Sequence, residues 1–119
     1  MPAEPPRSLT DPEDLKLVTL ARSTRARTRA AQGACVRDQD GRTYAAATVN
    51  LASLRLSAVQ LAVAMAVAGA AHGLEAVVVL GDTDAVPEQD LAAVRDLGGP
   101  GVPVHVAAAD GTVVSTLRS

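Results

Sequence analysis

The histidine and cysteine side chains of this sequence, His72, His105 and Cys35, are the ones whose types alone suit zinc or nucleophilic chemistry. A zinc site needs three or four such ligands, and a nucleophile needs a base beside it. His72 follows a long apolar segment, and His105 alternates with valines in a strand-like run. Cys35 also lies in an apolar run, where a lone cysteine is most often a small buried hydrophobic residue. We therefore interpret all three as structural residues.

Four carboxylates form a second group, Asp82, Asp84, Glu88 and Asp90. Carboxylate oxygens are ligands that Mg²⁺ and Ca²⁺ prefer. Their spacing differs from that of a calcium-binding loop, and acidic residues at the start of a helix also stabilise its free N–H groups. The sequence favours a helix start, with a divalent cation as the alternative.

Four arginines within eight residues form a third group: Arg22, Arg25, Arg27 and Arg29. They could contact the phosphates of a nucleotide or of RNA. Their position at the C-terminal end of a predicted helix favours a solvated helix end instead, because cations stabilise that end of the dipole. A formal net charge of −2 is too close to neutral to favour nucleic acid or a membrane surface as a partner of the whole chain.

Length and composition indicate one domain. The 119 residues are close to the commonest domain size. Residues 1–10 contain three prolines and few apolar residues, which predicts a disordered tail before a domain at 11–119. Tyr44 is the only aromatic residue, so the core must be built from Ala, Val and Leu. The N-terminal segment lacks the apolar run of a signal peptide, and we expect a cytoplasmic protein.

The order of the predicted elements is that of an α/β fold with three layers. A first helix is expected from Asp11 to about Arg25, because Asp11 is a good N-cap and Pro12 suits the first helical position. A second is expected over 87–97. Strands are predicted at 33–38, 42–49, 74–80, 102–107 and 112–117. An Asp-Gly pair between the first two strands predicts a hairpin. We therefore predict a mixed five-stranded sheet with helices on both faces.

Another helix, central in the chain, is predicted from Leu54 to Ala71, with Ser53 or Ser57 as its N-cap and Gly73 as its end. Residues 61–71 include no charged or polar side chain, so the helix is apolar around its whole circumference and must be covered on nearly every face. A membrane span needs about 20 apolar residues, more than this segment offers. We expect the helix to be covered by a second copy of the chain, in a dimer or tetramer.

This order of elements resembles that of the cytidine deaminase family. The similarity extends from about Asp11 to Val114 and rests on the segments GACVRDQDGRTYAAATVNLAS, SAVQLAVAMAVAGAAHGLEAVVVLGD and PEQDLAAVRDLGGPGVPVHVAAADGTVV. In the family these segments contain a G-A-A-L strand, a D-G hairpin, N-V-E-N-A-S, the helix starts C-A-E-R and P-C-x-x-C, and a final D-G-T. The matches lie in the order of elements and in two D-G turns, and not in the catalytic residues.

The resemblance implies a zinc site whose ligands this sequence lacks. In such deaminases one His or Cys and two Cys hold a zinc that activates water, and a Glu transfers protons. The matching positions hold Ser57 and Val59 in the central helix, and Glu88 and Leu91 in the later one. An alignment without a gap places Val59 and Leu61 at the first two positions instead. We therefore predict no catalytic residues and no zinc.

The resemblance also places Thr48 and Asn50 at the ribose-binding positions, so a pyrimidine nucleoside would have few polar contacts. Our first hypothesis is a pseudo-deaminase that acts as an oligomeric binding or scaffold protein. A second is an active cytidine or deoxycytidine deaminase with an unrecognised site, and a third is nucleotide or RNA binding through the four arginines. Degenerate relatives in high-GC bacteria tend to be encoded beside a ribosome-assembly GTPase, which implies such a partner by analogy alone.

Overall fold

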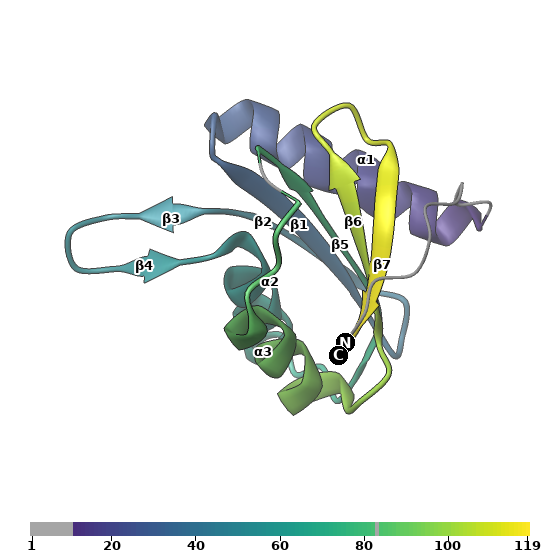
Figure 1. Cartoon of the computed structure of the whole chain (residues 1–119). Helices are drawn as coiled ribbons and strands as arrows, with labels where there is room; N and C mark the ends of the chain where they lie inside the picture. The colour runs from purple at the N-terminus through teal and green to yellow at the C-terminus, as the bar shows by residue number, and fades with distance from the viewer. Residues whose placement is uncertain (1–10, 83) are drawn as a thin grey trace.

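A mixed five-stranded sheet forms the middle layer of the computed structural model, which describes residues 11–82 and 84–119 (Figure 1). In their order across the sheet, the strands are β2 (Thr43–Ala47), β1 (Gln32–Asp38), β5 (Leu74–Gly81), β6 (Pro103–Ala108) and β7 (Val113–Arg118). β5 and β6 are parallel, and the other neighbours are antiparallel. The predicted α/β class and mixed sheet are confirmed. The predicted tail, residues 1–10, lies outside the described residues.

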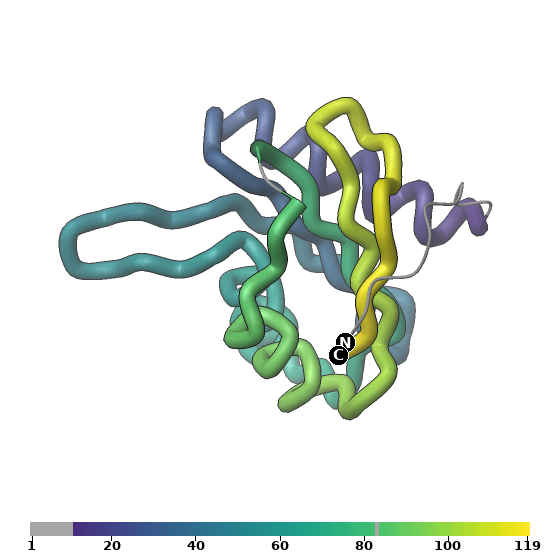
Figure 2. The backbone as a smooth tube through the Cα atoms, viewed as in Figure 1, coloured from purple at the N-terminus to yellow at the C-terminus, as the bar shows by residue number. Residues whose placement is uncertain are grey.

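Helices cover both faces of this sheet, as Figures 1 and 2 show. α1 (Pro12–Thr28) packs on one face around Leu17, Ala21 and the strand residues Cys35 and Val78. α2 (Ala58–Ala68) and α3 (Glu88–Gly98) lie on the other face, over a larger core of Val, Ala and Leu. Asp11 caps α1 by accepting a hydrogen bond from the Glu13 N–H at 2.9 Å, as predicted.

The predicted Asp-Gly hairpin joins β1 to β2 and is held by the buried carboxylate of Asp38. That carboxylate accepts hydrogen bonds from the N–H groups of Asp40 and Arg42 and from the Tyr44 hydroxyl. Burial would raise the pKa of Asp38, but these hydrogen bonds outweigh burial and hold it below its ordinary value. The single aromatic side chain of the protein therefore serves the turn as well as the core.

The central helix is much shorter than the predicted span from Leu54 to Ala71. α2 begins at Ala58, because Ser57 and Gln60 form a capping box in which each side chain bonds the other residue's backbone N–H. It ends at Ala68 with Gly69 as its C-cap, so the predicted end at Gly73 is wrong. Residues 54–56, predicted as helix, instead belong to a β-ribbon, which sequence reasoning missed.

This ribbon consists of β3 (Val49–Asn50) and β4 (Arg55–Leu56), an antiparallel pair outside the main sheet. A turn closed by a hydrogen bond from the Leu51 N–H to the Leu54 carbonyl joins them. The predicted strand over 42–49 is therefore divided, since β2 ends at Ala47 and the chain then leaves the sheet. The ribbon projects from the rest of the domain (Figures 1 and 2).

The described residues cover only part of the apolar central helix α2. Ala58, Val59, Ala62, Val63 and Ala66 are buried, whereas Met65 and Val67 remain 38% and 56% exposed. The further cover that the sequence predicts for this helix would therefore have to come from outside the described residues. Within 11–82 and 84–119, no helix combines the length and hydropathy that a bilayer crossing requires.

Candidate functional site

The N-termini of α2 and α3 meet on one side of the sheet. Each helix follows the carboxyl end of a strand, α2 after β2 and the ribbon, and α3 after β5. β2 and β5 run in the same direction because each is antiparallel to β1 between them, so both helices start near the same sheet edge. Here the Ser57 hydroxyl donates a hydrogen bond to Oδ1 of Asp90 at 2.8 Å. This contact ties the two helix starts together.

Asp90 is the third residue of α3 and only 2% exposed. Burial raises the pKa of its carboxyl group, because the charged form loses water, and the hydrogen bond from Ser57 opposes that rise in part. Ser57 also accepts a hydrogen bond from the Gln60 N–H at 3.0 Å, so its hydroxyl both donates and accepts. The site is thus a neutral hydroxyl bonded to a desolvated carboxyl group.

The other predicted site positions do not join this contact. Val59 and Leu91 are 1% and 7% exposed and belong to the core between these helices and the sheet. The Glu88 carboxylate is 73% exposed and accepts two hydrogen bonds from the Arg95 guanidinium, at 2.6 and 3.0 Å. Of the four positions compared with deaminase motifs, only Ser57 takes part in the hydrogen bond that joins the two helix starts.

The residues at this junction do not fit a zinc ion of the deaminase type. Such an ion takes nitrogen or sulfur ligands in a tetrahedral set, and the junction offers one hydroxyl and one carboxyl group that are already bonded to each other. Throughout the described part of the chain, no three His, Cys, Asp or Glu side chains come together as a metal-binding group. The donor set therefore supports no step that needs a metal here.

A polar pocket of about 280 Å³ opens beside Ser57. Its polar lining residues come from β2–β3, β4 and the starts of both helices: Thr48, Asn50, Arg55, Ser57, Gln60 and Gln89. The pocket includes both predicted substrate positions. Thr48 is already engaged, because its hydroxyl accepts from the Gln32 N–H at 3.1 Å, whereas Asn50 is exposed. Hydroxyl and amide groups suit hydrogen bonding to an uncharged polar ligand.

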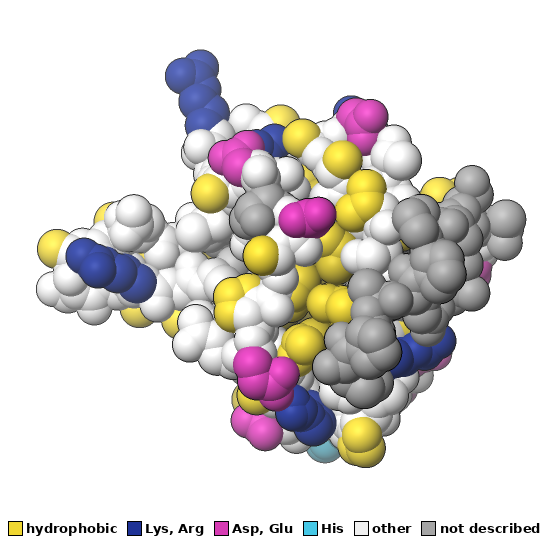
Figure 3. Space-filling model, viewed as in Figure 1, with side chains coloured by type: hydrophobic (Ala, Val, Ile, Leu, Met, Phe, Trp, Pro, Cys, Tyr) yellow, Lys and Arg dark blue, Asp and Glu magenta, His cyan; other side chains and the backbone are white. Residues whose placement is uncertain are grey.

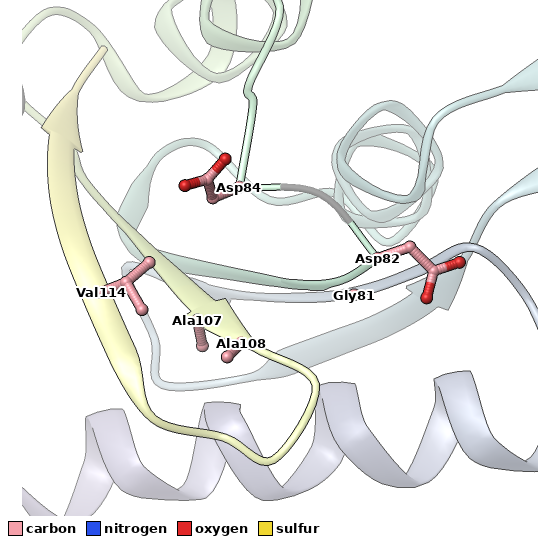
Figure 4. A pocket seen from close by; sticks show the side chains of 6 residues that line it. All are labelled: Gly81, Asp82, Asp84, Ala107, Ala108 and Val114. Atoms are coloured by element: carbon pink, nitrogen blue, oxygen red, sulfur yellow. The ribbon is translucent and has the colours of Figure 1, made fainter.

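A second pocket, of about 350 Å³, lies at the carboxyl ends of β5 and β6 and includes Asp82 and Asp84 (Figure 4). The two carboxylates point in different directions, and Asp82 forms an ion pair with Arg25 of α1. Of the other two members of the acidic group, Glu88 is paired with Arg95 and Asp90 is buried. The four carboxylates of the acidic group are therefore not brought together into one cation site.

The four arginines do not act as one surface. Arg25 bonds Asp82 and the Ala31 carbonyl, and Arg22 lies against the turn at Gly111. Arg27 and Arg29 are exposed. The structure therefore engages Arg25 in the fold and leaves Arg22, Arg27 and Arg29 exposed. Phosphate binding by these arginines stays a prediction.

Both histidines have structural contacts. His105 is 3% exposed on the α1 side of the sheet, with Nδ1 2.9 Å from the Thr116 hydroxyl and Nε2 3.5 Å from the Asp14 carboxylate. The backbone N–H of His72 donates to the Gln39 side chain, and its own side chain is exposed. Neither histidine is bonded to Ser57, so the described structure gives this hydroxyl no histidine base.

Sequence reasoning missed the role of Asp90. The sequence places this residue among four acids at a helix start, and the family resemblance puts the ligand positions at Glu88 and Leu91 instead. The available signal was the third helical position after Pro87, where an acid can satisfy free N–H groups. What could not be read was its burial, because that depends on the approach of Ser57 from another helix.

The fold and the junction of two helix starts define an α/β protein of the deaminase type. The chain matches the family model described as cytidine deaminase-like over residues 10–111, and it belongs to that family. Cytidine deaminase from Burkholderia pseudomallei has a similar structure, with a TM-score of 0.76 and 23% sequence identity over 90% of this chain and 91% of that one. Cytidine deaminase from Mycobacterium leprae has a TM-score of 0.67 and 21% identity, over 84% and 90% of the two chains. A comparison with curated protein sequences gives no match.

Proposed function

We propose that this protein is a cytoplasmic, non-catalytic member of the cytidine deaminase-like family that binds a pyrimidine nucleoside or a similar uncharged ligand as an oligomer. The observation that carries the proposal is the hydrogen bond between Ser57 and Asp90 at 2.8 Å. This bond joins a hydroxyl and a carboxyl group at the two helix starts, where the resemblance to cytidine deaminases implies zinc ligands. The hydrocarbon side chain of Val59 stands where that resemblance implies a proton-transferring Glu.

Deamination requires an activated water and a group that moves protons to the base. A neutral hydroxyl is a poor zinc ligand, and Val59 is 1% exposed and cannot transfer a proton. Asp90 has a carboxyl group, but it is buried and already accepts a hydrogen bond. These contacts support binding without chemical conversion.

Ligand binding is supported by the pocket beside Ser57. Its volume of about 280 Å³ is near the lower end of typical small-molecule sites. Asn50 and Gln89 contribute amide side chains to its lining, the amide oxygen of Gln60 is already bonded to the Ser57 N–H, and Arg55 is the one charged lining residue. Amide and hydroxyl groups can pair with the edge of a pyrimidine or with sugar hydroxyls.

The test combines zinc analysis, cytidine turnover and calorimetric binding on the full chain purified without chelator. We expect no stoichiometric zinc, no deamination of cytidine or deoxycytidine, and saturable binding of cytidine or uridine. Gln89→Ala should weaken binding, whereas Ser23→Ala, at an exposed position on α1, should leave it unchanged. Stoichiometric zinc with turnover would establish the active-deaminase alternative, and absence of nucleoside binding would refute the ligand assignment.

Oligomerisation is supported by the incomplete cover of α2. Met65 and Val67 are exposed on a helix without a single charged residue. Hydrophobic side chains on such a surface favour contact with another protein surface. The GTPase partner, implied only by the family resemblance, stays a prediction.

A further inference from the structure

Arg55 of β4 is the charged residue of the pocket beside Ser57. Its partner in the ribbon is Asn50, and because paired residues share a face, both side chains lie on the side of the ribbon that lines this pocket. The Arg55 Nε donates to the Leu51 carbonyl at 3.4 Å, and no described residue accepts from its two terminal NH₂ groups. Figure 3 shows a basic side chain on the projecting ribbon, and Arg55 is the only Lys or Arg within 49–56.

The charge of Arg55 has no counterion in this pocket, because none of the described lining residues is an Asp or a Glu. Four other arginines lie within ion-pair distance of a carboxylate: Arg25, Arg37, Arg42 and Arg95. The two acids at the start of α3 are engaged elsewhere, since Asp90 accepts from Ser57 and Glu88 from Arg95. The pocket is therefore positively charged in a chain whose formal net charge is −2.

The polar groups of the pocket that stay available are mainly donors. Thr48 and Ser57 each use their hydroxyl both to donate and to accept within the protein. The amide oxygen of Gln60 accepts from the Ser57 N–H, which leaves its NH₂ group to donate. Among the described residues, the side-chain amides of Asn50 and Gln89 have no hydrogen-bond partner. Together with the guanidinium, N–H donors outnumber acceptors, and the oxygens of an ionised phosphate are acceptors only.

The two helix starts reinforce this preference for a negative group. Ser57 and Gln60 at the start of α2 and Gln89 in the first turn of α3 line the pocket. Pro87, the N-cap of α3, provides no side-chain acceptor for the first N–H groups of that helix. The positive end of a helix dipole stabilises an anion. Its effect here has the same sign as the charge of Arg55.

We propose that the pocket binds a nucleoside monophosphate, with the phosphate held by Arg55 and the uncharged base and sugar by the amides of Asn50, Gln60 and Gln89. The inference rests on the proposed nucleoside site and extends its ligand by one anionic group. A guanidinium can pair with two oxygens of a phosphate at once, whereas an unphosphorylated nucleoside gives it only neutral acceptors. Arg55 is therefore the residue that selects the phosphorylated ligand.

Calorimetric titration of the full chain with cytidine, cytidine monophosphate and inorganic phosphate tests the ligand class. At about 0.05 M salt, cytidine monophosphate should bind about 10-fold more tightly than cytidine, because the phosphate pairs with Arg55. The advantage should shrink at about 0.5 M salt, since salt screens an exposed ion pair. Inorganic phosphate should bind more weakly than the nucleotide because it lacks the base and sugar. Equal affinity for inorganic phosphate and the nucleotide would refute the nucleotide assignment.

Variants of single cations test the role of Arg55. Arg55→Ala should remove the advantage of cytidine monophosphate and change the affinity for cytidine by no more than about 2-fold, and Arg55→Lys should keep part of the advantage because it keeps the charge. Lys16→Ala is the matched control, because Lys16 is exposed on α1, on the other face of the sheet, and it should bind both ligands like the wild type. Thermal unfolding by circular dichroism checks that each variant is folded.

The outcomes separate this inference from the proposed function. If cytidine binds and its monophosphate binds no more tightly, or if the advantage survives Arg55→Ala, Arg55 holds no phosphate and the inference fails while the nucleoside site stands. Loss of the advantage in R27A/R29A instead would assign the phosphate to the exposed arginines of α1. If neither cytidine nor its monophosphate binds, the inference and the proposed ligand are both refuted.

Discussion

Removing the Ser57 hydroxyl should destabilise the protein by about 2–4 kcal/mol, which can be worked out from its two hydrogen bonds. As N-cap of α2, the hydroxyl accepts from the Gln60 N–H, and loss of such a cap costs about 1 kcal/mol. As a donor, it bonds the buried Asp90, and a buried acceptor left without its partner costs about 1–3 kcal/mol. Ser57→Ala removes both bonds together.

The cost of Ser57→Ala should also depend on pH. The pKa of Asp90 is raised above its ordinary value of 3.8 by burial, and the Ser57 hydroxyl opposes that rise. A carboxyl group whose folded pKa exceeds its unfolded pKa contributes stability below the unfolded value, and this is lost as pH rises through the folded value. Without Ser57 the folded pKa rises further, so more stability is lost by neutral pH. The cost of Ser57→Ala should therefore be larger near neutral pH than below 3.8.

Urea unfolding followed by circular dichroism, at neutral pH and at acid pH, measures both effects. Ser23→Ala, at an exposed serine on α1, is the matched control and should change the free energy of unfolding by no more than about 0.5 kcal/mol. Asp90→Asn keeps a carbonyl acceptor for Ser57 but removes the ionisable group. In the Asp90→Asn background the pH dependence of the Ser57→Ala cost should disappear.

Two results would refute this reasoning. If Ser57→Ala costs no more than Ser23→Ala, the hydroxyl does not join the helices in solution. If its cost is the same at both pH values, or keeps its pH dependence in the Asp90→Asn background, Asp90 is not the group that responds to Ser57. The double-mutant cycle separates these cases, because contacting residues should show a coupling of about 0.5–3 kcal/mol.

Three further predictions concern the rest of the fold. Gly33→Ala should lower the free energy of unfolding in urea by more than about 2 kcal/mol, because the new methyl group would lie 2.3 Å from the Ala21 carbonyl oxygen. Gly73→Ala is the control and should be tolerated, because the nearest atom to its methyl group would be 3.9 Å away. Cys35, whose pKa burial raises to about 11, should resist thiol reagents at pH near 8 until the protein is unfolded, and rapid labelling of the folded protein would contradict its burial. Tyr44→Phe removes a hydrogen-bond donor to Asp38. Because the pKa of Asp38 is lowered in the folded protein, its carboxylate stabilises the fold above pH 3.8, and this stability is lost as pH falls through the folded pKa. Without the Tyr44 hydroxyl that pKa is lowered less, so acid unfolding should begin at higher pH.

The sheet and its outer helices were predictable because their signals are local. Asp11 with Pro12, the Asp-Gly turn and the alternating valines each determine a short segment through contacts within it. The central segment was not predictable in the same way. Leu54 and Leu56 are compatible with a continued apolar helix, and what makes Arg55 and Leu56 a strand is their pairing with Asn50 and Val49 across a turn. The sequence offers both Ser53 and Ser57 as N-cap of this helix. Only the pairing of β3 with β4 places Ser53 in the turn of the ribbon and leaves Ser57 as the N-cap.

In the candidate site, too, positions along the chain were predictable, whereas contacts between the two helices were not. Sequence comparison could place Ser57 and Val59 at the start of one helix and Glu88 and Leu91 at the start of another, because these positions are read along the chain. It could not say which side chain of α3 would face Ser57. The start of a helix turns through about 100° per residue. Two positions beyond the exposed Glu88, this rotation directs Asp90 inward.

The inward carboxyl group of Asp90 lies where the starts of α2 and α3 meet. Two helix N-termini that meet at one sheet edge bring free N–H groups and the positive ends of two dipoles together. A hydrogen-bond acceptor or a negative charge is stabilised at such a place. In related deaminases, the resemblance implies that zinc-bound cysteine thiolates lie there. In this protein the Asp90 carboxyl lies at this junction, and its hydrogen bond from Ser57 joins the helices directly. The same bond engages both the Ser57 hydroxyl and the Asp90 carboxyl, so joining the two helices and holding a reactive metal are alternative uses of these two groups.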